Sequence, residues 1–275
     1  MGCLCVKSDK ARDLDEGESV IQQYEAALGF GKLPVDVSVA SLEETSRKGA
    51  LTPDLLRAWF EKVGIPSTRL DNDSDSVACL YANFLDRGRY SCRKLGALAV
   101  LLGEGSLERK ARSLFRVYSR LTGELSTEDI DTLINTCCEL AFIQLPKLAE
   151  TETLVLRDLA TMRKLQKYLD KFKKFLGKIK DKLSKPLLVL GLSSVTEGKF
   201  VEVVVQKAPA LLSAQTLRAY ACSVIPELAR QHSASYEPAS AQLLARSQTR
   251  QSTVKALKRS QTTLSLKQSR TQSYG

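Results

Sequence analysis

The sequence contains little that metal chemistry or acid–base catalysis could use. Its 275 residues include a single histidine, His232, and seven cysteines with no Cys-x-x-Cys pair. Zinc sites are built from closely spaced cysteine and histidine side chains, so we expect none here. No glycine-rich phosphate-binding loop is present, and one histidine leaves little scope for general acid–base chemistry. The sequence therefore predicts a protein that is not an enzyme and carries no cofactor.

Aromatic residues and long apolar runs are also scarce. Only 6% of residues are aromatic although 43% are hydrophobic, so a core must be built mainly from Leu, Ile, Val and Ala. The apolar runs, such as residues 187–192, fall far short of the roughly 20 residues that a transmembrane helix needs. No secretory signal is present either. These absences predict a protein of cytosolic origin.

Charge is abundant but unevenly distributed. Residues 161–275 carry 21 Lys or Arg and 6 Asp or Glu, whereas residues 1–160 carry 20 and 25. The basic half favours a polyanionic partner such as an anionic membrane, nucleic acid or an acidic protein surface. Nucleic acid is the least favoured of these, because the basic tail lacks interleaved aromatic residues.

The first residues of the chain have the pattern of a lipid-modified N-terminus. Removal of Met1 exposes Gly2 as an acceptor for myristate, and Cys3 and Cys5 are placed for palmitoylation. One myristoyl chain binds membranes only marginally, so the cysteines supply the second signal. Val6 departs from the usual pattern, which has Ser or Thr at the sixth position. We expect lipid attachment at Gly2, Cys3 and Cys5.

Most of the chain up to residue 144 has the apolar periodicity of short helices. Helices are predicted from Ser19 onward, over 51–63, 77–85, 95–102 and 107–118, and over 127–140 with Ser126 as N-cap. The polar stretch 71–75 interrupts this pattern. A common layout recurs at four breaks, in which a glycine precedes an apolar residue by two positions. The four glycines are Gly49, Gly88, Gly123 and Gly198.

This layout resembles the loop centre of the neuronal calcium sensor (recoverin-like) and calcineurin B group of EF-hand proteins. The stretch that carries the resemblance comprises residues 80–91, 95–101 and 105–118. Residues 200–202 together with 208–212 are similar to the exit helix of a fourth hand and its ending. The resemblance implies an all-α fold of paired EF-hand-like helix-loop-helix units. It also implies a groove between paired hands that holds a partner helix or peptide. A generic helical bundle is the alternative.

The loops lack the ligands that calcium requires, namely oxygen donors at positions 1, 3 and 5 and a carboxylate at position 12. We therefore predict degenerate loops that bind no metal; a calcium sensor with atypical loops remains the alternative. Residues 71–75 have acidic spacing, but no glycine and no position-12 carboxylate follow them. In the four loops centred on these glycines, taken in chain order, the residues at positions 1, 3, 5 and 12 are Glu44, Ser46, Lys48 and Leu55; Asn83, Leu85, Arg87 and Lys94; Tyr118, Arg120, Thr122 and Asp129; and Ser193, Val195, Glu197 and Val204.

A long basic amphipathic helix is predicted within residues 145–189. Its apolar residues run from Leu165 to Leu183 at steps of three and four, and residues 161–185 hold ten basic and two acidic side chains. Such a helix can lie on an anionic membrane or bind calmodulin. It can equally be a domain helix with a solvated lysine face. The lysines expected to contact a polyanion are Lys164, Lys167, Lys171, Lys174, Lys178 and Lys182.

The last part of the chain, residues 231–275, has the composition of a disordered tail. Arginine lies three residues before Thr249, Thr253, Thr262 and Ser273, as in sites of basophilic kinases. Phosphate at these positions would cancel positive charge near a membrane and could release the tail.

These observations predict five segments: a lipidated flexible N-terminus (1–18), three EF-hand-like hands (19–144), an insert with the basic helix (145–189), a fourth degenerate hand (190–230) and the tail (231–275). The predicted function is a calcium-independent adaptor on the cytoplasmic face of a membrane, either plasma or ciliary/flagellar. A basic scaffold for cytoskeletal or nucleic-acid partners is a further alternative.

Overall fold

The computed structural model describes residues 9–46, 50–70, 72, 75–119, 123–188 and 194–224, all of which belong to one compact unit. These residues are mostly helical with little sheet, which confirms the predicted all-α class. Their buried apolar side chains form one continuous core cluster. No helix in the described ranges is long and apolar enough to cross a membrane.

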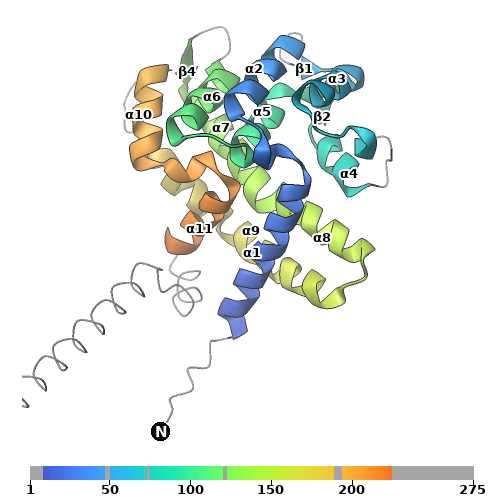
Figure 1. Cartoon of the computed structure of the whole chain (residues 1–275). Helices are drawn as coiled ribbons and strands as arrows, with labels where there is room; N and C mark the ends of the chain where they lie inside the picture. Colours follow the sequence, from blue (N-terminus) through green and yellow to red (C-terminus); the bar gives the residue numbers. More distant parts are fainter. Residues whose placement is uncertain are drawn as a thin grey trace, which may run out of the picture. The chain divides into compact units, whose positions relative to one another are not determined.

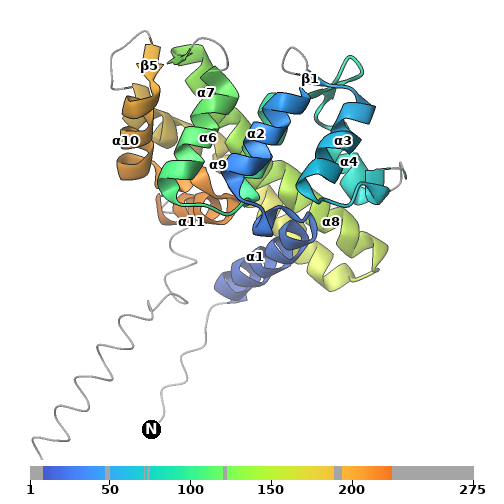
Figure 2. The same ribbon diagram turned by 45° about the horizontal axis from the view of Figure 1, so that its top comes forward.

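Two groups of helices stand side by side, each next to a small antiparallel sheet (Figures 1 and 2). The first group comprises α2 (Val35–Thr45), α3 (Pro53–Val63), α4 (Ser76–Ala82) and α5 (Cys92–Leu102), with β1 (Ala50–Leu51), β2 (Leu85–Asp86) and β3 (Arg89–Ser91). The second comprises α6 (Leu107–Ser119), α7 (Thr127–Glu139), α10 (Glu197–Lys207) and α11 (Ala214–Val224), with β4 (Glu124–Ser126) and β5 (Ser194–Thr196).

Three further helices lie beneath these groups in Figure 1: α1 (Asp9–Ala27), α8 (Leu145–Val155) and α9 (Leu159–Leu188). Helix α1 packs on α8 and α9, and α9 packs on α7 and α10. The short helices η1 (Phe30–Lys32), η2 (Thr68–Leu70) and η4 (Pro209–Leu212) connect longer elements, and the π-helical segment η3 (Leu140–Gln144) joins α7 to α8.

Local sequence signals explain where several helices begin. Ser126 caps α7 as predicted: its hydroxyl accepts a hydrogen bond from the Asp129 amide, and the Asp129 carboxylate accepts one from the Ser126 amide. This reciprocal capping box satisfies two backbone donors that a helix start otherwise leaves unpaired. Thr52 caps α3 in a similar way and is followed by Pro53, whose fixed backbone angle suits the first helical position.

Some predicted boundaries are wrong. The segment 1–18 was predicted to be flexible, but α1 begins at Asp9, because tertiary contacts with α8 and α9 support its polar sequence as a helix. The boundary between residues 144 and 145 falls inside the continuous helical run of α7, η3 and α8. The helix predicted over 77–85 ends at Ala82, because Leu85 pairs with Tyr90 in the β2–β3 hairpin.

A buried cluster of charges joins the beginning and the end of this unit. Arg218 of α11 is only 1% exposed, and its guanidinium contacts the carboxylates of Glu18 at 2.9 Å and Glu25 at 2.7 Å, both on α1. The same guanidinium donates to the carbonyl of Ala141 in η3, and the Tyr168 hydroxyl of α9 donates to Glu18. Four elements that are distant in the sequence therefore share one polar centre.

The electrostatics of Glu18 follow from this arrangement. Burial alone would raise the pKa of Glu18, but the charge and hydrogen bonds of Arg218 outweigh burial and hold this pKa below its ordinary value. The Glu18 carboxylate is therefore ionised at neutral pH and compensates the buried guanidinium.

We predict that Arg218→Ala lowers the free energy of unfolding by about 3–5 kcal/mol, because it leaves two partly or fully buried carboxylates without their counter-ion. Urea unfolding followed by circular dichroism measures this loss. The matched control is Arg112→Ala, which removes an exposed arginine 3.9 Å from Glu197 and should cost about 0–1 kcal/mol. Equal losses for the two variants would contradict the assigned role of the cluster.

Candidate functional site: the paired loops and the lysine helix

The predicted loops meet in pairs through their short strands. Leu51 of β1 pairs with Tyr90 of β3, and Leu125 of β4 pairs with Val195 of β5, both antiparallel. Both sheets lie along one edge of the unit, on the side opposite α1 and α8 (Figure 2). Each of the apolar residues Leu51, Tyr90 and Leu125 follows its predicted glycine by two positions, as an EF-hand loop requires.

The glycines at the predicted loop centres lie in different structural positions. Gly88 has φ +75° in the turn of the β2–β3 hairpin, and Gly123 has φ +68° just before β4, both of which favour glycine. Gly49 lies outside the described residues. Gly198 was predicted to be a loop centre but lies in the first turn of α10, so this prediction is wrong. The strand pairing instead makes Val195, not Phe200, the counterpart of Leu125.

A lysine closes the second loop, residues 83–94. The Lys94 ammonium, at position 12, donates a hydrogen bond of 3.0 Å to the carbonyl of Asn83, at position 1. It also lies 6.0 Å from the centre of the Phe84 ring, within range of a cation–π contact. The ends of this loop are thus joined by a cation that belongs to the chain itself.

An arginine from the neighbouring helix closes the third loop, residues 118–129. One terminal nitrogen of Arg93, on α5, donates to the Asp129 carboxylate at 2.6 Å and to the Tyr118 carbonyl at 3.3 Å. These acceptors are positions 12 and 1 of the loop. The guanidinium carbon also lies 5.4 Å from the centre of the Tyr118 ring. In both loops a basic side chain therefore bridges the first and twelfth positions.

The charge state of Asp129 suits this bridge. Burial alone would raise the pKa of Asp129, but hydrogen bonds from Ser126 and the positive charge of Arg93 lower it below its ordinary value. The carboxylate is therefore ionised and already bound at neutral pH. Arg93 escaped the sequence prediction because it is position 11 of the second loop and not one of the ligand positions 1, 3, 5 and 12. Its place one residue before a basic position 12 was the available signal.

In the described residues, loops 83–94 and 118–129 lack a free set of carboxylate ligands of the kind that an EF-hand offers to calcium. Loop 83–94 offers no carboxylate at positions 1, 3, 5 or 12, and Lys94 places a positive charge within it. In loop 118–129 the carboxylate of Asp129 is engaged by Arg93. Across the described ranges, no group of three or more His, Cys, Asp or Glu side chains could hold a metal ion.

The apolar stripe of the basic helix is buried rather than displayed. From Leu165 to Leu187 this face of α9 belongs to the core, where Phe172 stacks on Phe142 with ring centres 5.0 Å apart. As folded, α9 cannot present this stripe to a bilayer or to calmodulin. A contact through the apolar face is therefore contradicted, because that face packs in the core of the unit. The packing favours the alternative of a domain helix with a solvated lysine face, and contact through the lysines stays a prediction.

The lysine face of α9 remains at the surface. Lys167, Lys174, Lys178 and Lys182 are exposed, while Lys164 and Lys171 are partly buried. Lys174 and Lys178 cover the ring of Phe175 at 5.6 and 5.4 Å, and Lys182 donates to the carbonyl of Val224. This face can attract a polyanion electrostatically without any apolar insertion.

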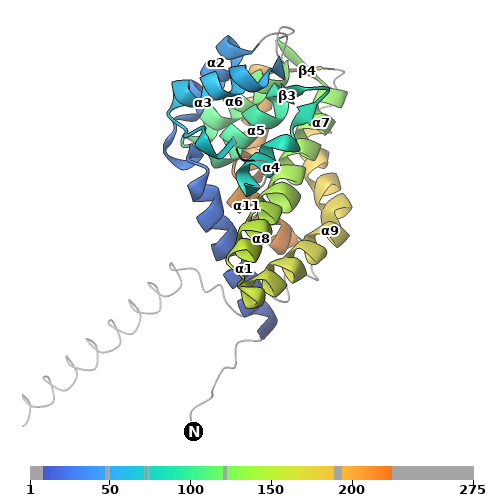
Figure 3. The ribbon, with the colours of Figure 1, turned by 90° about the vertical axis from the view of Figure 1, so that its right-hand side faces the viewer.

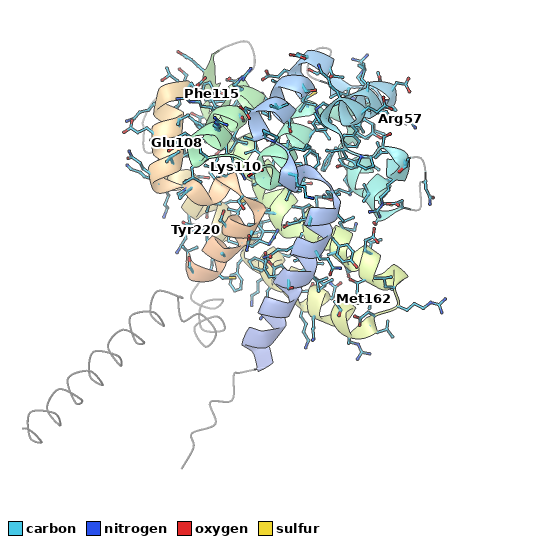
Figure 4. The ribbon with its side chains drawn as sticks, in the orientation of Figure 1. Arg57, Glu108, Lys110, Phe115, Met162 and Tyr220 are labelled. Carbon is cyan, nitrogen blue, oxygen red and sulfur yellow. The ribbon has the colours of Figure 1, made fainter. Side chains whose placement is uncertain are left out.

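An apolar groove of about 560 Å³ lies on the flank formed by α6, η4 and α11. The side chains of Lys110 and Tyr220 come to this flank from different helices (Figure 4). The Lys110 ammonium donates to the carbonyl of Leu212 at 3.0 Å, and burial lowers its pKa. Other residues that line the groove include Leu107, Pro209, Ala210, Thr216 and Ala219.

The remaining predicted sites lie outside the described residues: the lipidation sites Gly2, Cys3 and Cys5, and the phosphorylation sites Thr249, Thr253, Thr262 and Ser273. Comparison with known proteins gives no assignment, since no family model and no curated protein matches the sequence.

We predict that Arg93→Ala lowers the free energy of unfolding by about 1–3 kcal/mol, because it removes charged hydrogen bonds that join α5 to the third loop. Arg89→Ala, at an exposed position of β3, is the matched control and should change stability by no more than about 0.5 kcal/mol. Urea unfolding measures both. If Arg93→Ala behaved like Arg89→Ala, the arginine bridge would not hold the loop.

Proposed function

We propose that this chain is a calcium-independent, EF-hand-like adaptor attached to the cytoplasmic face of a membrane. The observation that carries the proposal is the closure of loops 83–94 and 118–129 by Lys94 and Arg93. A bound calcium ion draws the first and twelfth positions of an EF-hand loop together. Here a covalently attached cation occupies that role, so the paired loops need no metal to keep their shape.

The strand pairing supports the EF-hand-like interpretation. Leu51 with Tyr90, and Leu125 with Val195, join loops in antiparallel pairs, and each joined pair is flanked by helices. A scaffold whose loops are permanently closed has no calcium-dependent transition by which to change its surface. Constitutive binding of one partner, rather than switching, is the behaviour that follows.

We assign membrane attachment to lipids on Gly2, Cys3 and Cys5, assisted by the lysine face of α9. Two acyl groups anchor a protein stably where one does not. Each basic residue near an anionic surface adds about 1 kcal/mol of attraction. The exposed ammonium groups of Lys167, Lys174 and Lys178 supply such charges without exposing the apolar stripe beneath them.

The groove between α6, η4 and α11 is the surface that we assign to the partner helix or peptide. Its lining is mostly apolar, which suits the apolar face of an amphipathic segment. Lys110, which lines the groove, donates a hydrogen bond to the Leu212 carbonyl, so its ammonium group is a polar group at a fixed position.

We predict that calorimetric titration of the full-length chain with calcium shows no saturable binding, because Lys94 and Arg93 already occupy the positions that calcium would bridge. Thermal unfolding should likewise be unchanged by calcium or by a chelator. A calcium-binding EF-hand protein measured in parallel verifies the titration. Saturable micromolar binding would instead favour the alternative of a calcium sensor with atypical loops.

We predict that Gly2→Ala moves the protein from the membrane fraction to the soluble fraction of cells, because the acceptor of myristate is lost. The double variant Cys3→Ser/Cys5→Ser should give partial release, since a single acyl chain holds only marginally. Leu4→Ala, which alters the same segment but no acceptor, is the control. Full membrane retention of Gly2→Ala would refute the myristate assignment and favour the basic scaffold.

A further inference from the structure

Exposed apolar side chains gather at one place in the described residues. Of the six large hydrophobic side chains that are exposed there, three fall within residues 154–159. Leu154 is 54% exposed, Leu156 69% and Leu159 56%. Single exposed leucines are ordinary on protein surfaces, but three in one turn form a patch that needs an explanation. We call these three residues the leucine tip.

The leucine tip sits on an ordered turn between α8 and α9. Helix α8 ends with hydrogen bonds from the Arg157 amide to the Leu154 carbonyl at 3.0 Å and from the Asp158 amide to the Thr153 carbonyl at 3.2 Å. Helix α9 begins under the Asp158 side chain, which accepts bonds from the amide and the hydroxyl of Thr161. These hydrogen bonds fix the backbone of the turn, and no described element covers the three leucine side chains.

Basic side chains lie within the tip and follow it along α9 in the sequence. Arg157, Arg163 and Lys167 are exposed, and Lys164 is partly buried. The acidic residue within the turn, Asp158, has both carboxylate oxygens bound to Thr161. Arg157 has φ +59°, a left-handed backbone conformation in which glycine is the usual residue at a helix end. The chain therefore keeps a basic side chain at the tip where glycine would be less strained.

The start of α9, next to the tip, packs beside the middle of α1. Thr161 and Lys164 at the start of α9 line a small cavity together with Gly17 and Val20 of α1. Figure 3 shows the α8–α9 turn and the beginning of α1 both in the lower part of the unit, whereas Figure 1 shows them on different sides of it; Figure 4 labels Met162, in the first turn of α9.

We propose that the leucine tip inserts into the interface of an anionic membrane, with Arg157, Arg163 and Lys167 contacting lipid headgroups. Apolar side chains rimmed by basic ones are the composition of interfacial membrane anchors. A protein partner would need acidic groups around an apolar pocket, whereas an anionic bilayer offers both over its whole surface. The inference rests on the proposed membrane attachment and gives it a defined orientation: the α8–α9 turn faces the lipid and the paired loops face away.

The test uses the full-length chain made without acylation and vesicles of phosphatidylcholine with and without phosphatidylserine. The triple variant Leu154→Ser/Leu156→Ser/Leu159→Ser should bind phosphatidylserine vesicles at least about tenfold more weakly in sedimentation. Val37→Ser, which removes a 58% exposed side chain of α2, is the matched control and should bind as the wild type does. Unchanged binding of the triple variant would overturn the proposal.

Two further variants separate insertion from mere adsorption and from a structural effect. The fluorescence of the tryptophan introduced by Leu156→Trp should be quenched by lipids brominated in their acyl chains, whereas the fluorescence of the buried Trp59 should not. Arg157→Gly should keep or raise the melting temperature, because it relieves the left-handed backbone, yet weaken binding to phosphatidylserine vesicles. A tip that contacts protein or a second copy of the chain would give no quenching, and the triple variant would lower the mass measured by ultracentrifugation.

Failure of this inference is distinguishable from failure of the proposed anchor. One outcome is that Gly2→Ala leaves the membrane in cells while the fluorescence of the unacylated Leu156→Trp variant is not quenched. In that case the attached lipids alone hold the protein and the tip does not insert. If Gly2→Ala stays on membranes and the triple variant releases it, the tip is the anchor and the acylation assignment is wrong.

Discussion

The buried guanidinium of Arg218 is the constraint on which the arrangement of this protein depends. A charge that is 1% exposed is tolerable only if opposite charges reach it, and Glu18 and Glu25 of α1 provide them. Helix α1 must therefore lie against α11, although the two contributing segments are some 190–200 residues apart. Tyr168 and the Ala141 carbonyl complete the cluster, which fixes α9 and η3 as well. The position of α1 within the unit follows from this one cluster.

In loops 83–94 and 118–129, a basic side chain likewise joins parts of the chain by binding oxygen acceptors. Arg93 spans Tyr118 and Asp129, and Lys94 reaches Asn83, so each loop is closed by a side chain rather than by a ligand. A tethered cation cannot be withdrawn by a chelator or a change in calcium concentration. The paired loops then act as fixed joints between helices. The proposed contacts are assigned to surfaces away from these loops: the groove beside α11, the lysine face of α9 and the turn between α8 and α9.

Several features were predictable because they depend on neighbours in the sequence. The helical class, the capping of α7 by Ser126 and the turns at Gly88 and Gly123 follow from periodicity, side-chain capping and backbone conformation within a few residues. The fourth loop centre was misplaced at Gly198 because glycine spacing is a local rule, whereas the register of β5 is set by β4, some 70 residues earlier.

By itself the sequence determined the composition of each surface: an acylation pattern at Gly2, a lysine-rich face on α9 and loops without ligands. Only the tertiary structure decided which surfaces are available. An amphipathic pattern shows that one face of a helix is apolar. It does not show whether a membrane or the rest of the chain buries that face. Burial of Phe172 and its neighbours answers this for α9, since the core satisfies that face. The same packing leaves Leu154, Leu156 and Leu159 uncovered, because helices that meet at a tight turn cannot bury the residues at its apex.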